Sequence, residues 1–287
     1  MGFAVAALSV APGFAHAAPV DLFYERTVMT AAQERCSLFA PDVAAALASA
    51  AAQARGAALR AGTSDATLRQ VERNALAKAG SADCASADIS TAALRVKIAF
   101  AGFAKMDRLT YPGDVADWRA DRGIGRGARW KLAQDVAFGR DRMAFGLAGV
   151  SNPGALVAVA RFADGAEPYA ARLILRDDSR SSGPYLNRWT TGSTADLPLI
   201  KRLPPSGALK TFAAAARSPA TPDLLPKDAG PGWTFRFPDA AAHDLAQLDP
   251  REAIAVEFLF PGDVTRRAYV EVGDFAAGRA FLQLAQR

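Results

Sequence analysis

Apolar residues recur with a helical period between residues 25 and 109. This period predicts four helices, over residues 25–40, 41–61, 64–80 and 86–109. In the last of them the apolar residues step by 4, 3, 4 and 3 along one helix face: Ile89, Ala93, Val96, Phe100 and Phe103. The short connections between the four segments predict an antiparallel helical bundle.

Residues that begin helices support these boundaries. Pro41 suits the first position of the second helix. Thr63 or Ser64 can cap the third helix by accepting a hydrogen bond from its first turn, and Ser86 or Asp88 can cap the fourth. Many of the inward-facing positions are alanine, which buries little apolar area. The bundle is therefore expected to have a thin core.

Beyond residue 111 the apolar period changes from helical to alternating, which is typical of strands. Residues 130–138 and 143–147 are predicted to form one hairpin. Residues 156–162 and 169–175 are predicted to form a second.

The last part of the chain continues the alternating pattern. Residues 233–237, 254–260 and 268–272 predict three more strands, and residues 239–248 predict a short helix. Asp274 is expected to cap a last helix. In total the pattern predicts six to nine mainly antiparallel strands with one or two helices, as a β-sandwich or a curled sheet. The predicted fold class is α+β, with a helical bundle followed by a β-rich domain.

The first 17 residues have the pattern of a secretory signal peptide. Residues 3–11 form a short apolar run, and Ala15-His16-Ala17 follows as a cleavage site with small residues. No basic residue precedes the run, so a buried N-terminal helix is the alternative. No later segment is both uncharged and as long as the roughly 20 residues of a membrane-spanning helix. The predicted domains are residues 1–17 as signal peptide, 18–110 as helical bundle and 111–287 as β-rich domain.

The chain has two cysteines, Cys36 and Cys84, and both lie in the predicted bundle. In an exported protein an even number of cysteines indicates a disulfide, whereas two buried free thiols are the alternative. The bridge would close a loop of about 49 residues and stabilise the thin bundle by about 4 kcal/mol. The cysteine spacing fits no zinc or redox motif, and His243 is the sole histidine after residue 17, so no metal or cofactor is predicted.

The net charge is +5, and it is spread over both halves of the chain. The densest group of basic side chains would suit an anionic surface or an acidic partner: Arg119, Arg122, Arg126, Arg129, Arg140 and Arg142. The alternative is a solvated face of an arginine-rich protein. Basic and acidic residues alternate and no known reader motif is present, so nucleic-acid binding is not predicted.

Motifs for catalysis or ligand binding are weak. His243 lies in a helical segment and no Gly-x-Ser-x-Gly motif accompanies it, so it is expected to be an exposed helix residue. The glycines of residues 123–127 precede a strand, which favours a loop over a phosphate site. Asp177 and Asp178 lie between arginines and make a poor cation site. The irregular residues 177–207 are either a functional loop or a tolerated insertion.

The sequence therefore favours an exported protein, periplasmic or secreted, that acts as a non-enzymatic binding module. Its expected partner is an envelope protein or an anionic surface. The alternative is a hydrolase whose active site forms only in three dimensions in the β-rich domain. Glu257 and Glu271 are the first carboxylates to inspect, because each lies within a strand among apolar neighbours. A buried pair in a pocket would favour the enzyme, and an exposed pair would favour the binding module.

Overall fold

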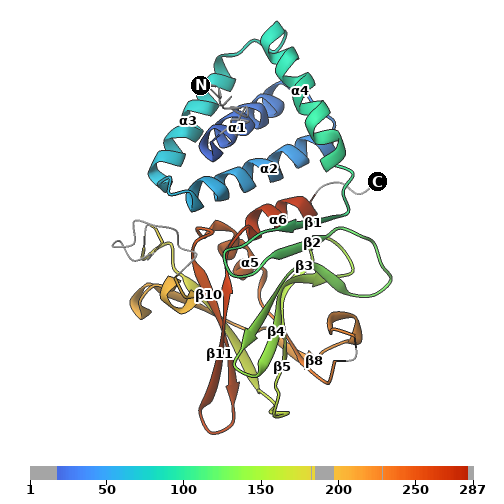
Figure 1. Ribbon diagram of the computed structural model, residues 1–287, viewed down its shortest axis with the longest axis vertical. Coiled ribbons are helices and arrows are strands. Elements are labelled where there is room, and N and C mark those ends of the chain that lie inside the picture. Colours follow the sequence, from blue (N-terminus) through green and yellow to red (C-terminus); the bar gives the residue numbers. More distant parts are fainter. Residues whose placement is uncertain (1–17, 182, 185–196, 228, 284–287) are drawn as a thin grey trace, which may run out of the picture.

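The structure is a computed structural model that describes residues 18–181, 183–184, 197–227 and 229–283. The predicted signal peptide and part of the irregular segment 177–207 lie outside the described residues. Four N-terminal helices are followed by a β-rich part with two antiparallel sheets and further helices (Figure 1). The predicted α+β fold class is confirmed.

The four helices follow the sequence closely in number and order. They are α1 (Pro19–Cys36), α2 (Pro41–Arg60), α3 (Asp65–Ser81) and α4 (Ala87–Phe103). Of the predicted cap residues, the two serines make the cap bonds. Ser64 Oγ accepts a hydrogen bond from the backbone N–H of Thr67 at 3.1 Å, and Ser86 Oγ accepts one from Ile89 at 3.3 Å.

Two predicted helix ends were wrong. The first helix ends at Cys36 because Ser37 adopts a left-handed conformation with φ 50° and closes the last turn. The fourth helix was expected to reach residue 109 but ends at Phe103. Residues 108–111 instead form β1 (Arg108–Tyr111), which pairs with β2 (Trp118–Asp121). Strand pairing outweighs local helix preference here, since Tyr111 and Trp118 become buried in the common core.

The helical part is built around α1. Figure 1 shows α1 framed by the other three helices, with α2 lying along the β-rich part. α1 packs against α2 and α3, whereas α2 also packs against α4 and against α6 (Phe275–Leu282). The predicted disulfide joins Cys36, at the end of α1, to Cys84, in the turn before α4, with 5.6 Å between their Cα atoms.

The β-rich part contains eleven strands within the described residues, more than the six to nine predicted. The seven-stranded sheet has the order β1-β2-β3-β4-β5-β9-β8, and the four-stranded sheet has the order β11-β10-β6-β7. The remaining bounds in the larger sheet are β3 (Arg129–Phe138), β4 (Asp141–Gly149), β5 (Ala155–Arg161), β8 (Ala216–Pro219) and β9 (Trp233–Arg236). Those in the smaller sheet are β6 (Ala170–Arg176), β7 (Leu209–Ala213), β10 (Ala253–Phe260) and β11 (Val264–Glu271).

The first predicted hairpin, β3–β4, is confirmed, and the second was wrong. β5 pairs with β4 and β9, whereas β6 pairs with β10 and β7, so residues 162–169 carry the chain from one sheet to the other. Alternation is a weak guide here, because β5 is buried at every position from Leu156 to Ala160. It carried no information on which strand lies beside which, and both strands face one shared core.

The core lies between the two sheets and is rich in phenylalanine. The ring of Phe258 lies 5.4 Å from Phe235 and 5.3 Å from Phe162 between ring centroids. α5 (Asp239–Gln247) and α6 cover one end of the sheets, and α6 also contacts β2 and β3 (Figure 1). α6 is therefore the element through which the β-rich part meets α2.

An ion pair with a buried carboxylate holds α2 to the start of α6. Arg60 donates two hydrogen bonds to the carboxylate of Asp274, at 2.9 and 3.0 Å. Burial raises the pKa of Asp274, and the Arg60 hydrogen bonds oppose this shift. Asp274 occupies the predicted cap position, but its side chain makes no cap bond because Arg60 engages it. Next to this pair, Ser49 Oγ donates to the carbonyl of Ala277 at 3.1 Å.

Gly56 in α2 is expected to be required by the close approach of Asp274. An alanine at a mid-helix glycine normally stabilises by up to about 1 kcal/mol. At Gly56, however, a Cβ atom would lie 2.7 Å from Asp274 Oδ1, so the carboxylate would have to move away from Arg60. Gly56→Ala is therefore expected to lower the free energy of unfolding by about 1–3 kcal/mol.

Urea denaturation measures this change, and Gly102→Ala is the matched control. Gly102 also lies in a helix, and a Cβ atom there would meet nothing within 4 Å. Gly102→Ala is expected to be neutral or stabilising. Equal stability of the two variants would contradict a tight contact between α2 and Asp274.

Candidate functional site

The six arginines of the predicted anionic-partner patch are spread over β2, the loop after it, β3 and the β3–β4 hairpin. Arg129 and Arg140 flank opposite ends of β3, whose ten residues span about 30 Å. Arg122 is buried and donates to the carbonyls of Ala104 and Met106, while Arg119 pairs with the exposed Asp135. The structure therefore gives several of these side chains local structural partners.

The β3–β4 hairpin carries two of the six arginines. Arg140 and Arg142 are both exposed there, and Arg142 donates to the carbonyl of Asp141. Arg126 is exposed in the loop between β2 and β3. Of the six arginines, Arg140 is the one that lines the cavity along β11 described below.

Glu257 and Glu271 are both buried, with 2% and 0% exposure. Burial alone would raise the pKa of Glu257, but hydrogen bonds from Arg267 and Arg172 outweigh it and leave the pKa lowered. Glu271 accepts the backbone N–H groups of Asp114 and Val115 at 2.9 and 2.8 Å. Both carboxylates have structural partners, and neither lines the described cavities. The hydrolase alternative gains no support from them.

Other predicted features take structural positions. His243 is exposed on α5, as predicted. Gly123 lies in a loop, where its N–H donates to Asp121 Oδ1 at 2.7 Å and its carbonyl accepts a hydrogen bond from Lys131. Among the described residues, no three His, Cys, Asp or Glu side chains are placed to hold a metal ion. None of the described helices is long and apolar enough to cross a membrane.

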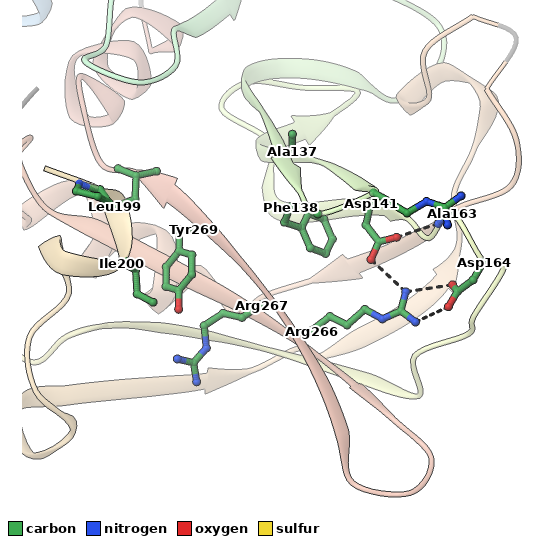
Figure 2. Close-up of a pocket in the computed structure, with 13 residues that line it drawn as sticks. Ala137, Phe138, Asp141, Ala163, Asp164, Leu199, Ile200, Arg266, Arg267 and Tyr269 are labelled. Carbon is green, nitrogen blue, oxygen red and sulfur yellow. Dashed lines mark hydrogen bonds and ion pairs between the residues drawn. The ribbon is translucent and has the colours of Figure 1, made fainter. Parts of the chain in front are cut away.

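A cavity of about 800 Å³ follows β11. Figure 2 shows Phe138 and Asp141 on one side of this strand, and Leu199, Ile200 and Tyr269 on the other. We call it the β11 cleft. Its lining residues are Ala137, Phe138, Gly139, Arg140, Asp141, Ala163, Asp164, Pro198, Leu199, Ile200, Arg266, Arg267 and Tyr269.

The cleft lies between two strand edges. β11 is an edge strand of its sheet, and β2 pairs with β3 only at Leu132 and Ala133. Just beyond that pairing, the side-chain amide of Gln134 bridges to β11. It accepts the N–H of Glu271 at 3.0 Å and donates to the carbonyl of Glu271 at 3.3 Å. The cleft begins where this bridge ends.

The hydrogen-bond pattern of β11 identifies the backbone groups on its free edge. In an antiparallel pair, alternate residues direct their N–H and C=O groups toward the partner strand and away from it. Glu271 bonds to Gln134, away from β10. By the same alternation, Tyr269, Arg267 and Thr265 present their backbone groups on the edge that carries the cleft. Within the described part of the chain, no hydrogen bond satisfies these groups.

The cleft is lined by apolar side chains and by charged side chains whose net charge is positive. Phe138 stacks on the core residue Phe258, with ring centroids 5.7 Å apart, and so anchors one wall. Arg266 donates to Asp164 and Asp141, and these hydrogen bonds raise the pKa of the guanidinium and lower that of Asp164. Arg140 has no ion pair among the described residues. It supplies the uncompensated positive charge of the cleft.

Sequence reasoning missed this cleft. Alternation assigns side chains to faces, but it does not reveal which strand edge lacks a neighbour. One signal was available: Arg266 and Arg267 place two charges at successive positions of a strand, which is typical of edge strands.

No protein-family model matches the chain, and no curated protein or solved structure is significantly similar to it.

Proposed function

We propose that this protein is a binding module that captures an extended segment of a partner polypeptide in the β11 cleft. The observation that carries the proposal is the row of unsatisfied backbone groups along the free edge of β11, of which those of Arg267 and Tyr269 belong to residues that line a cavity of about 800 Å³. An extended segment can add as a strand to such an edge, and the main-chain hydrogen bonds supply affinity.

The walls of the cleft indicate the chemistry of the segment. Alternate side chains of an added strand face opposite ways, so one set would meet Phe138 and the other Tyr269 and Ile200. Both walls suit apolar side chains. Arg140 favours an acidic residue near the β3–β4 turn, because the other lining charges already have partners. The proposed ligand is therefore an extended apolar segment with an acidic residue.

The disulfide supports a partner outside the cytoplasm. Disulfides persist in oxidising compartments, so Cys36–Cys84 supports a periplasmic or secreted protein. The signal-peptide pattern of residues 1–17 supports the same proposal. We therefore expect the captured segment to belong to an envelope or secreted protein.

Selection of peptides from a random display library on the oxidised full chain tests this function. Amide hydrogen exchange, followed by NMR with and without a selected peptide, reports on the free edge. We expect exchange at Thr265, Arg267 and Tyr269 to slow by at least about tenfold, because their amides gain partners. Ala268, whose amide already faces β10, is the internal control and is expected to change little.

A charge reversal tests the role of Arg140. Arg140→Glu is expected to weaken binding of an acidic peptide roughly three- to fivefold, as for an exposed ion pair. Arg142→Glu is the matched control, because Arg142 is exposed on the same hairpin but does not line the cleft. Peptide binding without protection of the three edge amides would contradict strand addition.

A further inference from the structure

A second cavity lies in the helical part, independent of the β11 cleft. The disulfide joins the end of α1 to the turn before α4, so both helices extend away from this point. Closer to the disulfide, Ala32 of α1 and Ile89 of α4 are buried in one cluster. Farther along, a cavity of about 490 Å³ separates them, and we call it the α1–α4 groove.

The groove is apolar inside. Met29 and Leu47 are buried at its base, and Leu22, Val96 and Phe100 are half-buried along its walls. The apolar face of α4 that the sequence predicted to be core is thus only partly covered, since Val96 and Phe100 face the groove. A cavity of this size, lined mainly by apolar side chains with a few polar groups, is typical of small-molecule sites of about 300–1,000 Å³.

The mouth of the groove carries net positive charge. Arg26, Lys78 and Arg95 line it, against one acidic residue, Glu25. The guanidinium of Arg26 already donates a hydrogen bond to the carbonyl of Ala50, at 2.8 Å. Lys78 and Arg95 are exposed and form no ion pair within the described part of the chain. Lys78 belongs to α3 and Arg95 to α4, so two exposed cations lie beside the apolar groove.

We infer that the α1–α4 groove binds a single-chain amphiphile with an anionic head, of the class of long-chain carboxylates. The apolar tail would lie along Met29, Leu47 and Phe100, and the head would meet Lys78 and Arg95. This inference does not rest on the proposed peptide binding. It adds a ligand of another chemical class at another site.

Charge argues against a second copy of the chain as the occupant. Two copies that met at α4 would bring Arg95 and Lys97 of each chain together, and like charges oppose such an interface. An anionic head group instead compensates the charges that are already present at the mouth. The complementarity therefore favours the amphiphile.

Calorimetric titration of the oxidised full chain with palmitate, kept below its micelle concentration, tests the inference. We expect about one palmitate per chain, since the groove has the volume of a single-ligand site. Hexadecyltrimethylammonium has the same tail and the opposite charge, and we expect it to bind at least about tenfold more weakly, a difference of 1.4 kcal/mol.

Two matched pairs of variants locate the site. Ala99 lines the groove, whereas Ala101 is exposed on the same helix and does not, so Ala99→Trp is expected to abolish binding and Ala101→Trp to leave it unchanged. Arg95→Glu is expected to weaken binding roughly three- to tenfold, and Lys97→Glu to have a smaller effect. Arg140→Glu, in the β11 cleft, is expected to bind palmitate as the wild type does.

Several results would overturn the inference. Absence of palmitate binding would do so directly, as would equal binding of palmitate and the cationic analogue. Binding that persists in Ala99→Trp but fails in Arg140→Glu would place the amphiphile in the β11 cleft. A dimer that Ala99→Trp disrupts, seen by light scattering without ligand, would make a second copy the occupant.

Discussion

Replacing Arg176 with methionine is expected to lower the free energy of unfolding by about 3–5 kcal/mol at neutral pH. Arg176 donates to both carboxylate oxygens of Glu252, at 2.8 and 3.0 Å, and both side chains are buried. Without the guanidinium, Glu252 would keep the N–H of Asp249 as a donor but would have lost its buried counter-charge. Methionine preserves the side-chain stem, so most of the loss would come from the unpaired carboxylate.

This loss should depend on pH. Burial raises the pKa of Glu252 and Arg176 opposes the shift, so removing Arg176 should raise that pKa further. A carboxyl whose pKa is higher in the folded state stabilises the fold below its unfolded pKa, and this contribution disappears as the pH rises through the folded pKa. The deficit of Arg176→Met should therefore be smaller near about pH 5 than near about pH 8.

Urea denaturation at the two pH values measures the deficit, with Arg180→Met as the control. Arg180 is an exposed arginine four residues along, and it pairs with Asp177 at 3.2 Å. Its replacement is expected to change stability by less than about 0.5 kcal/mol. A deficit in Arg176→Met that matches the control, or that does not vary with pH, would show that Glu252 does not depend on this arginine.

Cys84→Ser is expected to destabilise the helical part by about 4 kcal/mol, because the disulfide closes a loop with a sequence separation of 48 residues. The core of this part is thin, as the sequence suggests. Several of its buried side chains are alanines: Ala32, Ala54, Ala58, Ala75, Ala79 and Ala93. A loss of this size is a large fraction of the stability of an ordinary domain.

The effect can be located within the molecule. All 4 tryptophans lie in the β-rich half of the sequence, so their fluorescence follows that half, whereas circular dichroism at 222 nm is dominated by α1–α4. The dichroism transition of Cys84→Ser should shift to lower urea more than the fluorescence transition. The double variant Cys36→Ser/Cys84→Ser should behave like the single one, because the cross-link and not a lone thiol is responsible. Unchanged melts on reduction of the wild type would contradict this prediction.

Local signals in the sequence predicted the elements well. Helix period, serine caps and strand alternation depend on residues close in sequence, and Ser64, Ser86 and the β3–β4 hairpin lie where they were expected. The short strands β1, β2, β7 and β8 escaped prediction. β9 is equally short but was predicted, because the alternation of Trp233 and Phe235 continues to Phe237, one residue beyond the strand.

Long-range contacts account for what the sequence could not predict. Asp274 looked like a helix cap, yet it is engaged by Arg60, 214 residues away. Glu257 looked like a candidate catalytic carboxylate, yet Arg172 approaches it from the neighbouring strand β6. The β11 cleft forms where the edges of the two sheets are not joined by backbone pairing. This arrangement cannot be predicted from any single segment of the sequence. Arg140 was included in the predicted patch, but only the fold separates it from Arg129 and brings it to the cleft.

The Gln134 bridge limits any strand that enters the cleft. Its amide occupies the N–H and C=O of Glu271, so a segment that pairs with Tyr269 cannot continue along β11 in that direction. The captured segment must therefore end or turn at this point. Gln134 thus acts as a stop that fixes the register, and it would make the module selective for a chain terminus or a bend over the middle of a long strand.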